Sequence, residues 1–368
     1  MDFFCKNTGF FYKTCYTEDR IGRVEEVRFP MDFRSAYIDL CVEDASENKP
    51  LMLEQVLFCP VLLWTCKELR DHGVQRFFVV CDQPWKEEVE RVLSSVEGVK
   101  VFTDAAAARA EAGECVAFSG AVLPMNGSEA QFGWFKVESR AELFAAANRC
   151  REAVCRKLVA QGVTFIDPDT AYIDPRAEIG AGTVVLPNTI VRGASVVGEH
   201  CELGPNTVIR DCTVGDHTTI NASQINESTI GSHTTVGPFA YVRPNCSVGD
   251  HCRIGDFVEL KNSVLDDGTK VSHLTYVGDS DVGKRVNFGC GTVTTNYDGV
   301  KKYRCTIGDD VFLGCNTNLI APVEVGEGAY TAAGSTITED VPAGALAVAR
   351  ARQENKPGWV KKFFAKKR

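Results

Sequence analysis

The sequence lacks the features that would define a membrane, secreted or nucleic-acid-binding protein. No apolar run approaches the roughly 18 residues of a membrane span, and the first twenty residues interleave Phe with Lys, Asp and Glu instead of forming a signal core. Basic residues are outnumbered: 40 Lys and Arg against 49 Asp and Glu give a formal net charge of −9. An acidic protein repels phosphate backbones at long range. We therefore expect a cytoplasmic protein with neither a membrane nor a nucleic-acid partner.

Paired cysteine motifs are also missing. The chain has 16 cysteines, but no two of them have the CxxC spacing of a zinc site or a thioredoxin-like motif. A small apolar side chain also suits many of their positions. We expect reduced, structural thiols and no metal site.

A six-residue repeat occupies the carboxyl-terminal half. An aliphatic residue, usually followed by Gly, recurs at Ile179, Val185, Val191, Val197, Leu203, Ile209, Val214, Ile220, Ile230, Val236, Val242, Val248, Ile254, Leu260, Ile307, Leu313, Leu319, Val325 and Ile337. This period is typical of a parallel β-helix, in which three hexads, roughly 18 residues, close one triangular coil around the aliphatic side chains. We predict a left-handed β-helix over residues 164–349. By analogy with its class, it assembles as a homotrimer.

The preceding residues predict a different architecture. Residues 34–138 alternate strands (36–41, 76–81, 99–102 and 114–118) with helices (near 60–73, 85–94 and 104–112), as in a small, doubly wound, Rossmann-like α/β domain. Ser139 and Glu142 form a capping box that opens a linker helix over 139–163. Residues 1–33 show no clear periodicity, and 350–368 form a basic tail. No Gly-rich loop follows the first strand, so we expect no catalysis in the α/β domain.

Two cations interrupt the repeat where Gly is usual. Arg243 and Lys261 are separated by three hexads, so they should occupy the same corner of adjacent coils, roughly 5 Å from each other. Stacked cations repel unless an anion lies between them, which predicts a phosphate-binding corner. Arg192 and Arg210 have the same spacing, so a solvated charge ladder is the alternative.

His273 is the candidate base. It follows the inward Val271, and we expect the in-phase Gly255 and Gly291 to leave its imidazole accessible in a notch. Residues 295–304 exceed the repeat length and predict a loop that leaves the helix, from which Asn296, Tyr297 and Lys302 would reach a neighbouring prism.

These residues lie in a longer set of motifs that carries a family resemblance. The matching runs are 237–244, 255–261, 272–279, 296–299, 307–312 and 332–336. Residues 237–359 closely resemble the acetyltransferase domain of the bifunctional N-acetylglucosamine-1-phosphate uridyltransferase/glucosamine-1-phosphate N-acetyltransferase family, and weaker similarity reaches residue 139. The resemblance implies acetyl-CoA-dependent N-acetylation of glucosamine 1-phosphate on the route to UDP-N-acetylglucosamine, a cell-wall precursor.

The resemblance also implies residue roles. His273 would be the general base, oriented by Glu259. The sugar-phosphate site would comprise Arg243, Lys261, Tyr276, Asn287 and Lys302, and the acetyl-CoA site Cys290, Asn296, Tyr297, Cys315, Ala333 and Arg350. The family commonly has Ala and Ser in place of Cys290 and Cys315. No metal is needed for acetyl transfer.

The amino-terminal half departs from the family. Its α/β domain is shortened, and Glu138 stands where the family has an Asn that binds magnesium. We expect a degenerate nucleotidyltransferase-like remnant that has lost uridyl transfer, and magnesium only if that activity survives. Three alternatives remain: another amino sugar phosphate or nucleotide sugar as acceptor, a non-enzymatic trimeric scaffold, and a zinc carbonic anhydrase using His233 and His251, which lack a third His at ligand spacing.

Overall fold

The computed structural model describes residues 34–41, 49–126, 132–137 and 139–365. The chain divides into two compact units, residues 1–211 and 212–368, so the division falls inside the predicted β-helix. The expected leader over 1–33 and Glu138 lie outside the described residues. No helix in the described ranges is both long enough and apolar enough to span a membrane.

The first unit contains the predicted α/β domain. Its parallel sheet has the order β5 (Val99–Phe102), β4 (Arg76–Val80), β1 (Ser35–Asp39) and β6 (Val116–Ser119). Three helices alternate with these strands: α1 (Val61–Asp71), α2 (Lys86–Val92) and α3 (Ala105–Ala112). Tyr37 and Phe78 pack on Ala108 and Ala112, which places α3 against the sheet. The predicted strands and helices are confirmed to within about two residues at each end.

Several short elements of this unit were not predicted. A hairpin joins β7 (Ala121–Asn126) to β8 (Phe132–Val137), and a smaller one joins β2 (Gln55–Val56) to β3 (Cys59–Pro60). Three 3-10 helices span Leu51–Leu53, Gln83–Trp85 and Pro168–Thr170.

The predicted capping box is present at the start of α4 (Arg140–Ala160). The Ser139 hydroxyl accepts a hydrogen bond from the Glu142 amide at 3.2 Å. The first β-helix coils of this unit follow, with parallel pairing of β9 (Thr164–Phe165), β12 (Val184–Val185) and β15 (Glu202–Leu203), of β10 (Tyr172–Ile173), β13 (Ile190–Arg192) and β16 (Val208–Arg210), and of β11 (Glu178–Ile179) and β14 (Val196–Val197).

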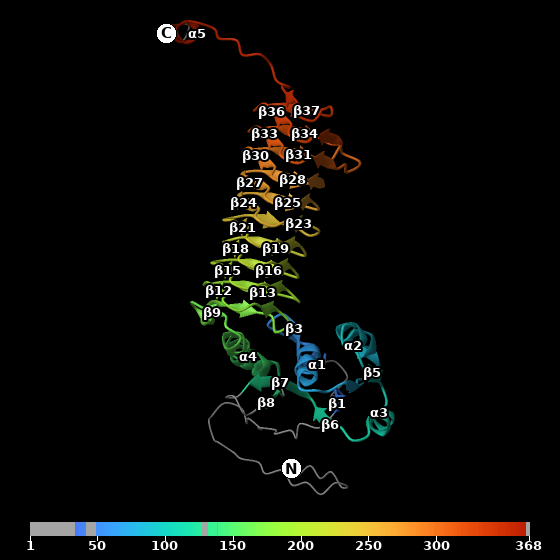
Figure 1. Ribbon diagram of the computed structural model, residues 1–368. Coiled ribbons are helices and arrows are strands. Elements are labelled where there is room, and N and C mark those ends of the chain that lie inside the picture. The colour runs from blue at the N-terminus through green and yellow to red at the C-terminus, as the bar shows by residue number, and fades with distance from the viewer. Residues whose placement is uncertain (1–33, 42–48, 127–131, 138, 366–368) are drawn as a thin grey trace. The chain divides into compact units, whose positions relative to one another are not determined.

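The second unit is built from coils of a left-handed parallel β-helix, whose strands stack in rows (Figure 1). One sheet contains β19 (Gln224–Asn226), β22 (Tyr241–Val242), β25 (Glu259–Lys261), β28 (Tyr276–Gly278), β31 (Val293–Thr295), β34 (Asn318–Ile320) and β37 (Thr336–Ile337). A second contains β17 (Thr213–Val214), β20 (Thr229–Ile230), β23 (Ser247–Val248), β26 (Val264–Leu265), β29 (Ser280–Val282), β32 (Cys305–Ile307) and β35 (Val323–Val325). The third contains β18 (Thr219–Ile220), β21 (Thr235–Val236), β24 (Arg253–Asp256), β27 (Lys270–His273), β30 (Asn287–Phe288), β33 (Phe312–Leu313), β36 (Tyr330–Thr331) and β38 (Leu346–Ala347), and a short helix, α5 (Trp359–Ala365), ends the described chain.

The inward side chains are those that the repeat predicted. Val242, Leu260 and Leu313 are fully buried, as are their equivalents on neighbouring coils. Coil length varies along the unit. The coil from Thr229 to its partner Ser247 has the regular length, whereas the next, from Ser247 to its partner Val264, is shorter. The coil that starts at Asp281 is longest, because residues 296–304 leave the stack beside β31 and β34 as the orange loop in Figure 1 before Thr306 restores the pairing. Hydrogen-bond register thus fixes which side chains are neighbours, whatever the residue count.

Candidate active site

One corner of the second unit aligns several of the predicted residues. Leu274 N–H donates to Asp256 O, Asn316 N–H to Cys290 O and Gly334 N–H to Cys315 O, at 2.8–2.9 Å. With the pairing of β27 and β30, these bonds place Asp256, His273, Cys290, Cys315 and Ala333 at the same corner on successive coils. We call this set the corner column. It brings the candidate base and three predicted acetyl-CoA residues into one row.

Within the corner column, His273 is bonded to a carboxylate that sequence reasoning missed. Nδ1 of His273 lies 2.5 Å from Oδ1 of Asp256, and the His273 side chain is 52% exposed. This bond lowers the pKa of Asp256 and outweighs the opposing effect of desolvation; the charge of Arg253 acts in the same direction as the bond. Asp256 is therefore ionised at neutral pH.

Two expectations about the surroundings of His273 need correction. The residues in register with it are Asp256 and Cys290, not Gly255 and Gly291, because the coil from Asp256 to His273 and the coil from Lys270 to Asn287 are both shorter than the regular repeat. Glu259, which was expected to orient His273, instead accepts a hydrogen bond from Arg243 Nη1 at 2.9 Å. The Gly255 backbone lies so close to the next coil that a Cβ there would fall 1.9 Å from Ser272 O.

Three of the predicted cationic side chains lie close together. The pairing of Val242 with Leu260 puts Arg243 beside Lys261 on adjacent coils. Lys302 reaches the same place from the loop: its pKa is lowered, first by a side-chain contact with Lys261 and then by the charge of Lys261, with Arg243 acting in the same direction. Lys261 and Arg243 thus disfavour the charged form of Lys302, and a bound anion would stabilise it.

Asp279 joins this cation cluster to the loop. Its carboxylate is buried and accepts hydrogen bonds from Lys261 Nζ at 3.2 Å, from Asn262 Nδ2 at 2.6 Å and from Asn296 Nδ2. Asn296 Nδ2 also lies 3.5 Å from the Tyr276 hydroxyl. Sequence reasoning placed Asp279 in a matching run but gave it no role; its separation from Lys261 by one regular repeat was the available signal.

The other predicted residues lie on the loop, on β30 and on later coils. Tyr297 forms an isolated antiparallel β-bridge with Lys302 across the loop. Its hydroxyl donates to Gly299 O at 2.6 Å, and its side chain is exposed. Asn287 is half-buried in β30, Cys290 is half-buried and Cys315 is exposed. Arg350 approaches Gly334, next to Ala333. No hydrogen bond or ion pair described in the structure connects Asn287 to the Asp256–His273 pair.

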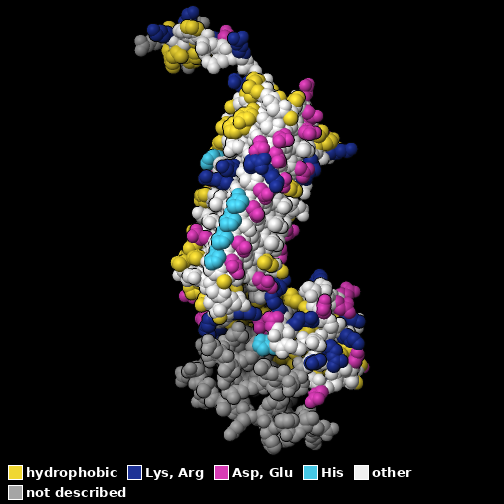
Figure 2. Space-filling model, in the orientation of Figure 1, with side chains coloured by type: hydrophobic (Ala, Val, Ile, Leu, Met, Phe, Trp, Pro, Cys, Tyr) yellow, Lys and Arg dark blue, Asp and Glu magenta, His cyan; other side chains and the backbone are white. Residues whose placement is uncertain are grey.

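Two side-chain stacks bear on the alternatives. Arg192 and Arg210 pair in register, as their spacing predicted, and Arg192 lies 4.6 Å from the Phe58 ring. The imidazoles of His217, His233 and His251 stack at 4.8 and 4.9 Å, within the row of histidines in Figure 2. His217 escaped the sequence search because the coil that leads from it to His233 is shorter than the regular repeat. No group of three or more His, Cys, Asp or Glu among the described residues has the geometry to hold a metal ion.

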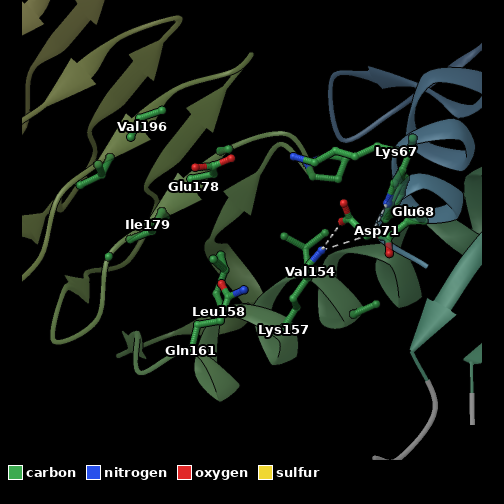
Figure 3. Close-up of a pocket in the computed structure, with 16 residues that line it drawn as sticks. Lys67, Glu68, Asp71, Val154, Lys157, Leu158, Gln161, Glu178, Ile179 and Val196 are labelled. Carbon is green, nitrogen blue, oxygen red and sulfur yellow. Dashed lines mark hydrogen bonds and ion pairs between the residues drawn. The ribbon is translucent and has the colours of Figure 1, made fainter. Parts of the chain in front are cut away.

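The first unit has a separate cavity of about 450 Å³ between α1, α4 and its own coils (Figure 3). Lys157 lies at its wall, 3.5 Å from Glu68 and 3.7 Å from Asp71, and Ile179 and Val197 contribute apolar surface. Lys157, Glu68 and Asp71 are thus already paired with one another.

Comparison with known proteins finds the hexapeptide repeat and related sequences. The family model described as "Bacterial transferase hexapeptide (six repeats)" matches residues 176–211, 227–262 and 304–339. The bifunctional protein GlmU of Caldanaerobacter subterraneus subsp. tengcongensis is 53% identical over 232 residues, which are 63% of this chain and 51% of that protein. GlmU of Geobacillus sp. strain WCH70 is 51% identical over 231 residues, which are 63% of this chain and 50% of the relative. Among solved structures, the UDP-N-acetylglucosamine acyltransferase from Campylobacter jejuni matches with a TM-score of 0.32 and 15% identity, covering 49% of this chain and 70% of that one.

The repeat defines the class of fold, a hexapeptide-repeat β-helix, which is similar over the three matched stretches to bacterial hexapeptide transferases. Over the aligned 63% of its length, the chain is a homologue of the bifunctional GlmU proteins. It spans about half the length of those relatives.

Proposed function

We propose that the second unit transfers the acetyl group of acetyl-CoA to the amino group of glucosamine 1-phosphate. The observation that carries the proposal is the grouping of Arg243, Lys261 and Lys302 in the same unit as a His273–carboxylate pair. The cations supply an anion site for the sugar phosphate, and the imidazole supplies a base. GlmU homology favours this chemistry over the other acceptors and over a non-catalytic scaffold.

The mechanism needs only groups on this chain and the two substrates. The acceptor amine must lose a proton to attack the thioester carbonyl, and His273 takes that proton at Nε2 while Nδ1 stays bonded to Asp256. In this proposal, backbone N–H groups near Cys290 and Cys315 stabilise the oxyanion. The coenzyme A thiol leaves with the proton returned to it. Asn296, Tyr297, Ala333 and Arg350 are the proposed contacts of acetyl-CoA, and Tyr276 and Asn287 those of the sugar.

The proposed assembly is a homotrimer in the cytoplasm. Phe239 and Phe257 stack at 5.4 Å and remain 60% and 58% exposed, and Leu274 continues this apolar row beside the corner column. An apolar row of this kind favours association with a second prism. For the shortened α/β domain we propose loss of uridyl transfer.

One assay with the full chain tests these proposals. Coenzyme A release is measured with glucosamine 1-phosphate, glucosamine and glucosamine 6-phosphate, and pyrophosphate release with UTP, magnesium and N-acetylglucosamine 1-phosphate. We expect release with glucosamine 1-phosphate alone and no pyrophosphate. Equal rates with unphosphorylated glucosamine would contradict the cation site, and rapid pyrophosphate release would contradict loss of uridyl transfer.

A further inference from the structure

We propose that Asp256, and not Glu259, is the positioning residue for His273. The inference rests on the proposed acetyl transfer, and it assigns the step that orients the base to a side chain outside the set that the family resemblance supplied. It follows from register and from one side-chain contact, the hydrogen bond between Asp256 and His273.

The backbone holds these two side chains together. Asp256 ends β24 and His273 ends β27, and the two residues are direct partners in the parallel ladder. Leu274 N–H donates to Asp256 O at 2.9 Å, so the pairing persists past the end of the strands. Because both side chains leave paired positions of one sheet, the bond between Oδ1 and Nδ1 requires no loop to order first. The pairing of adjacent coils thus fixes this contact.

The contact also selects the imidazole tautomer. Ionised Asp256 only accepts hydrogen bonds, so Nδ1 of His273 must carry the proton that it donates. The lone pair then lies on Nε2, the nitrogen that is left to accept a proton from the amine. When Nε2 takes that proton, the neighbouring carboxylate stabilises the imidazolium.

Glu259 bonds to Arg243 and not to His273. It lies in β25, in a different sheet from His273, and its register partners are Tyr241 and Tyr276. Its Oε1 atom accepts from Arg243 Nη1, and this bond raises the pKa of Arg243. Glu259 therefore orients a cation of the phosphate site, and its loss should alter phosphate binding more than proton transfer.

The shortening of the coil is the reason that Asp256 lies beside His273. In a coil of regular length Gly255 would face His273, as the repeat predicted, and no carboxylate would lie beside the ring. The shortened coil advances the register by one position, so Asp256 replaces Gly255. The same shift leaves Gly255 against Ser272 O, where only Gly fits.

The test compares Asp256→Asn, Asp256→Glu and Glu259→Gln with the wild-type chain in steady-state acetyl transfer to glucosamine 1-phosphate across pH. We expect Asp256→Asn to lower kcat by about 10- to 100-fold, a part of the roughly 10²- to 10⁴-fold that a positioned general base contributes, with little change in either KM. The acidic limb of its pH–rate profile should move to lower pH, because the imidazolium has lost its negative neighbour. Asp256→Glu should restore part of kcat, and Glu259→Gln should change the KM for the sugar phosphate more than kcat.

The inference is overturned if Asp256→Asn keeps the wild-type kcat and pH profile, or if Glu259→Gln shows the kcat loss and pH shift instead. Circular dichroism of each variant confirms folding. Nitrogen-15 spectra of labelled histidine, with His273 assigned by difference from His273→Gln, give a readout that needs no turnover. If the wild type acetylates no amino sugar, the proposed function fails, but an Asp256-dependent Nδ1 signal still supports the pairing; an unchanged signal refutes it.

Discussion

The buried carboxylate of Asp279 offers the most direct test of how the site is held together. The perturbation is Asp279→Asn, which keeps the shape of the side chain but removes its charge and half of its accepting capacity. In the folded protein three donors, on Lys261, Asn262 and Asn296, converge on this carboxylate. After the substitution the Lys261 ammonium has no carboxylate partner at Asp279, although its side chain is only 18% exposed.

The magnitude follows from that exposure. Removing one partner of a buried ion pair costs about 3–5 kcal/mol, because the remaining charge is left without compensation. Since Lys261 keeps some contact with solvent, we expect a loss near the lower end of that range, about 3 kcal/mol of unfolding free energy.

The effect of pH has a defined sign. Burial acts to raise the pKa of Asp279, but hydrogen bonds from Asn262, Lys261 and Asn296 and the charge of Lys261 outweigh it, so the pKa is lowered. A lowered carboxyl pKa stabilises the fold above the unfolded value of about 3.9, and this contribution is lost as the pH falls through the folded value. The advantage of the wild type over Asp279→Asn should therefore be full at pH 7 and shrink below about pH 4.

Urea unfolding followed by circular dichroism measures the difference at pH 7 and at acidic pH. Asp310→Asn is the matched control, because it removes an exposed carboxylate that bonds Arg285 on the same β-helix, and an ion pair in water contributes little to stability. Equal urea midpoints for Asp279→Asn and Asp310→Asn would refute the reasoning, as would a difference that persists unchanged at acidic pH.

Three further outcomes are expected. Lys302→Ala should raise the KM for the sugar phosphate about tenfold or more and leave that for acetyl-CoA unchanged, because one charged contact with the phosphate is lost; steady-state kinetics checks this, and a selective rise for acetyl-CoA would contradict it. Gly255→Ala should lower the melting temperature and acetyl transfer together, since its Cβ would fall 1.9 Å from Ser272 O; thermal unfolding by circular dichroism and coenzyme A release check this, and an unchanged melting temperature would contradict it. At pH 8 iodoacetamide should label exposed Cys315 faster than Cys41, because burial and Asp39 raise the pKa of Cys41 to about 12; peptide mass spectrometry reads the order, and faster labelling of Cys41 would count against it.

The fold was accessible from the sequence because its signals are local. Inward residues such as Val242 and Leu260 recur with the six-residue repeat. The capping box at Ser139 marks the start of α4 from residues that are adjacent in sequence. The cation pair was also predictable, since Arg243 and Lys261 are separated by one regular coil.

What the sequence could not supply is register. Shortened coils hid the stacking of His217 on His233 and the pairing of Asp256 with His273, because counting by the regular repeat points to a residue beside the true neighbour. The hub at Asp279 depends on a loop that folds back on the coil, which no periodicity describes. Most errors in the site thus arose where the chain departs from its own repeat.

The excursion of residues 296–304 has a consequence for how such a chain can change. The strand before the excursion pairs without interruption with the strand after it: Ser280 with Cys305, Asp281 with Thr306 and Val282 with Ile307. The strand pairing therefore does not depend on how much polypeptide lies between consecutive coils, and the exposed part of the excursion, between Asn296 and Arg304, can be exchanged without changing that pairing. Acceptor preference, to the extent that it resides in Lys302, can diversify separately from the residues of the corner column.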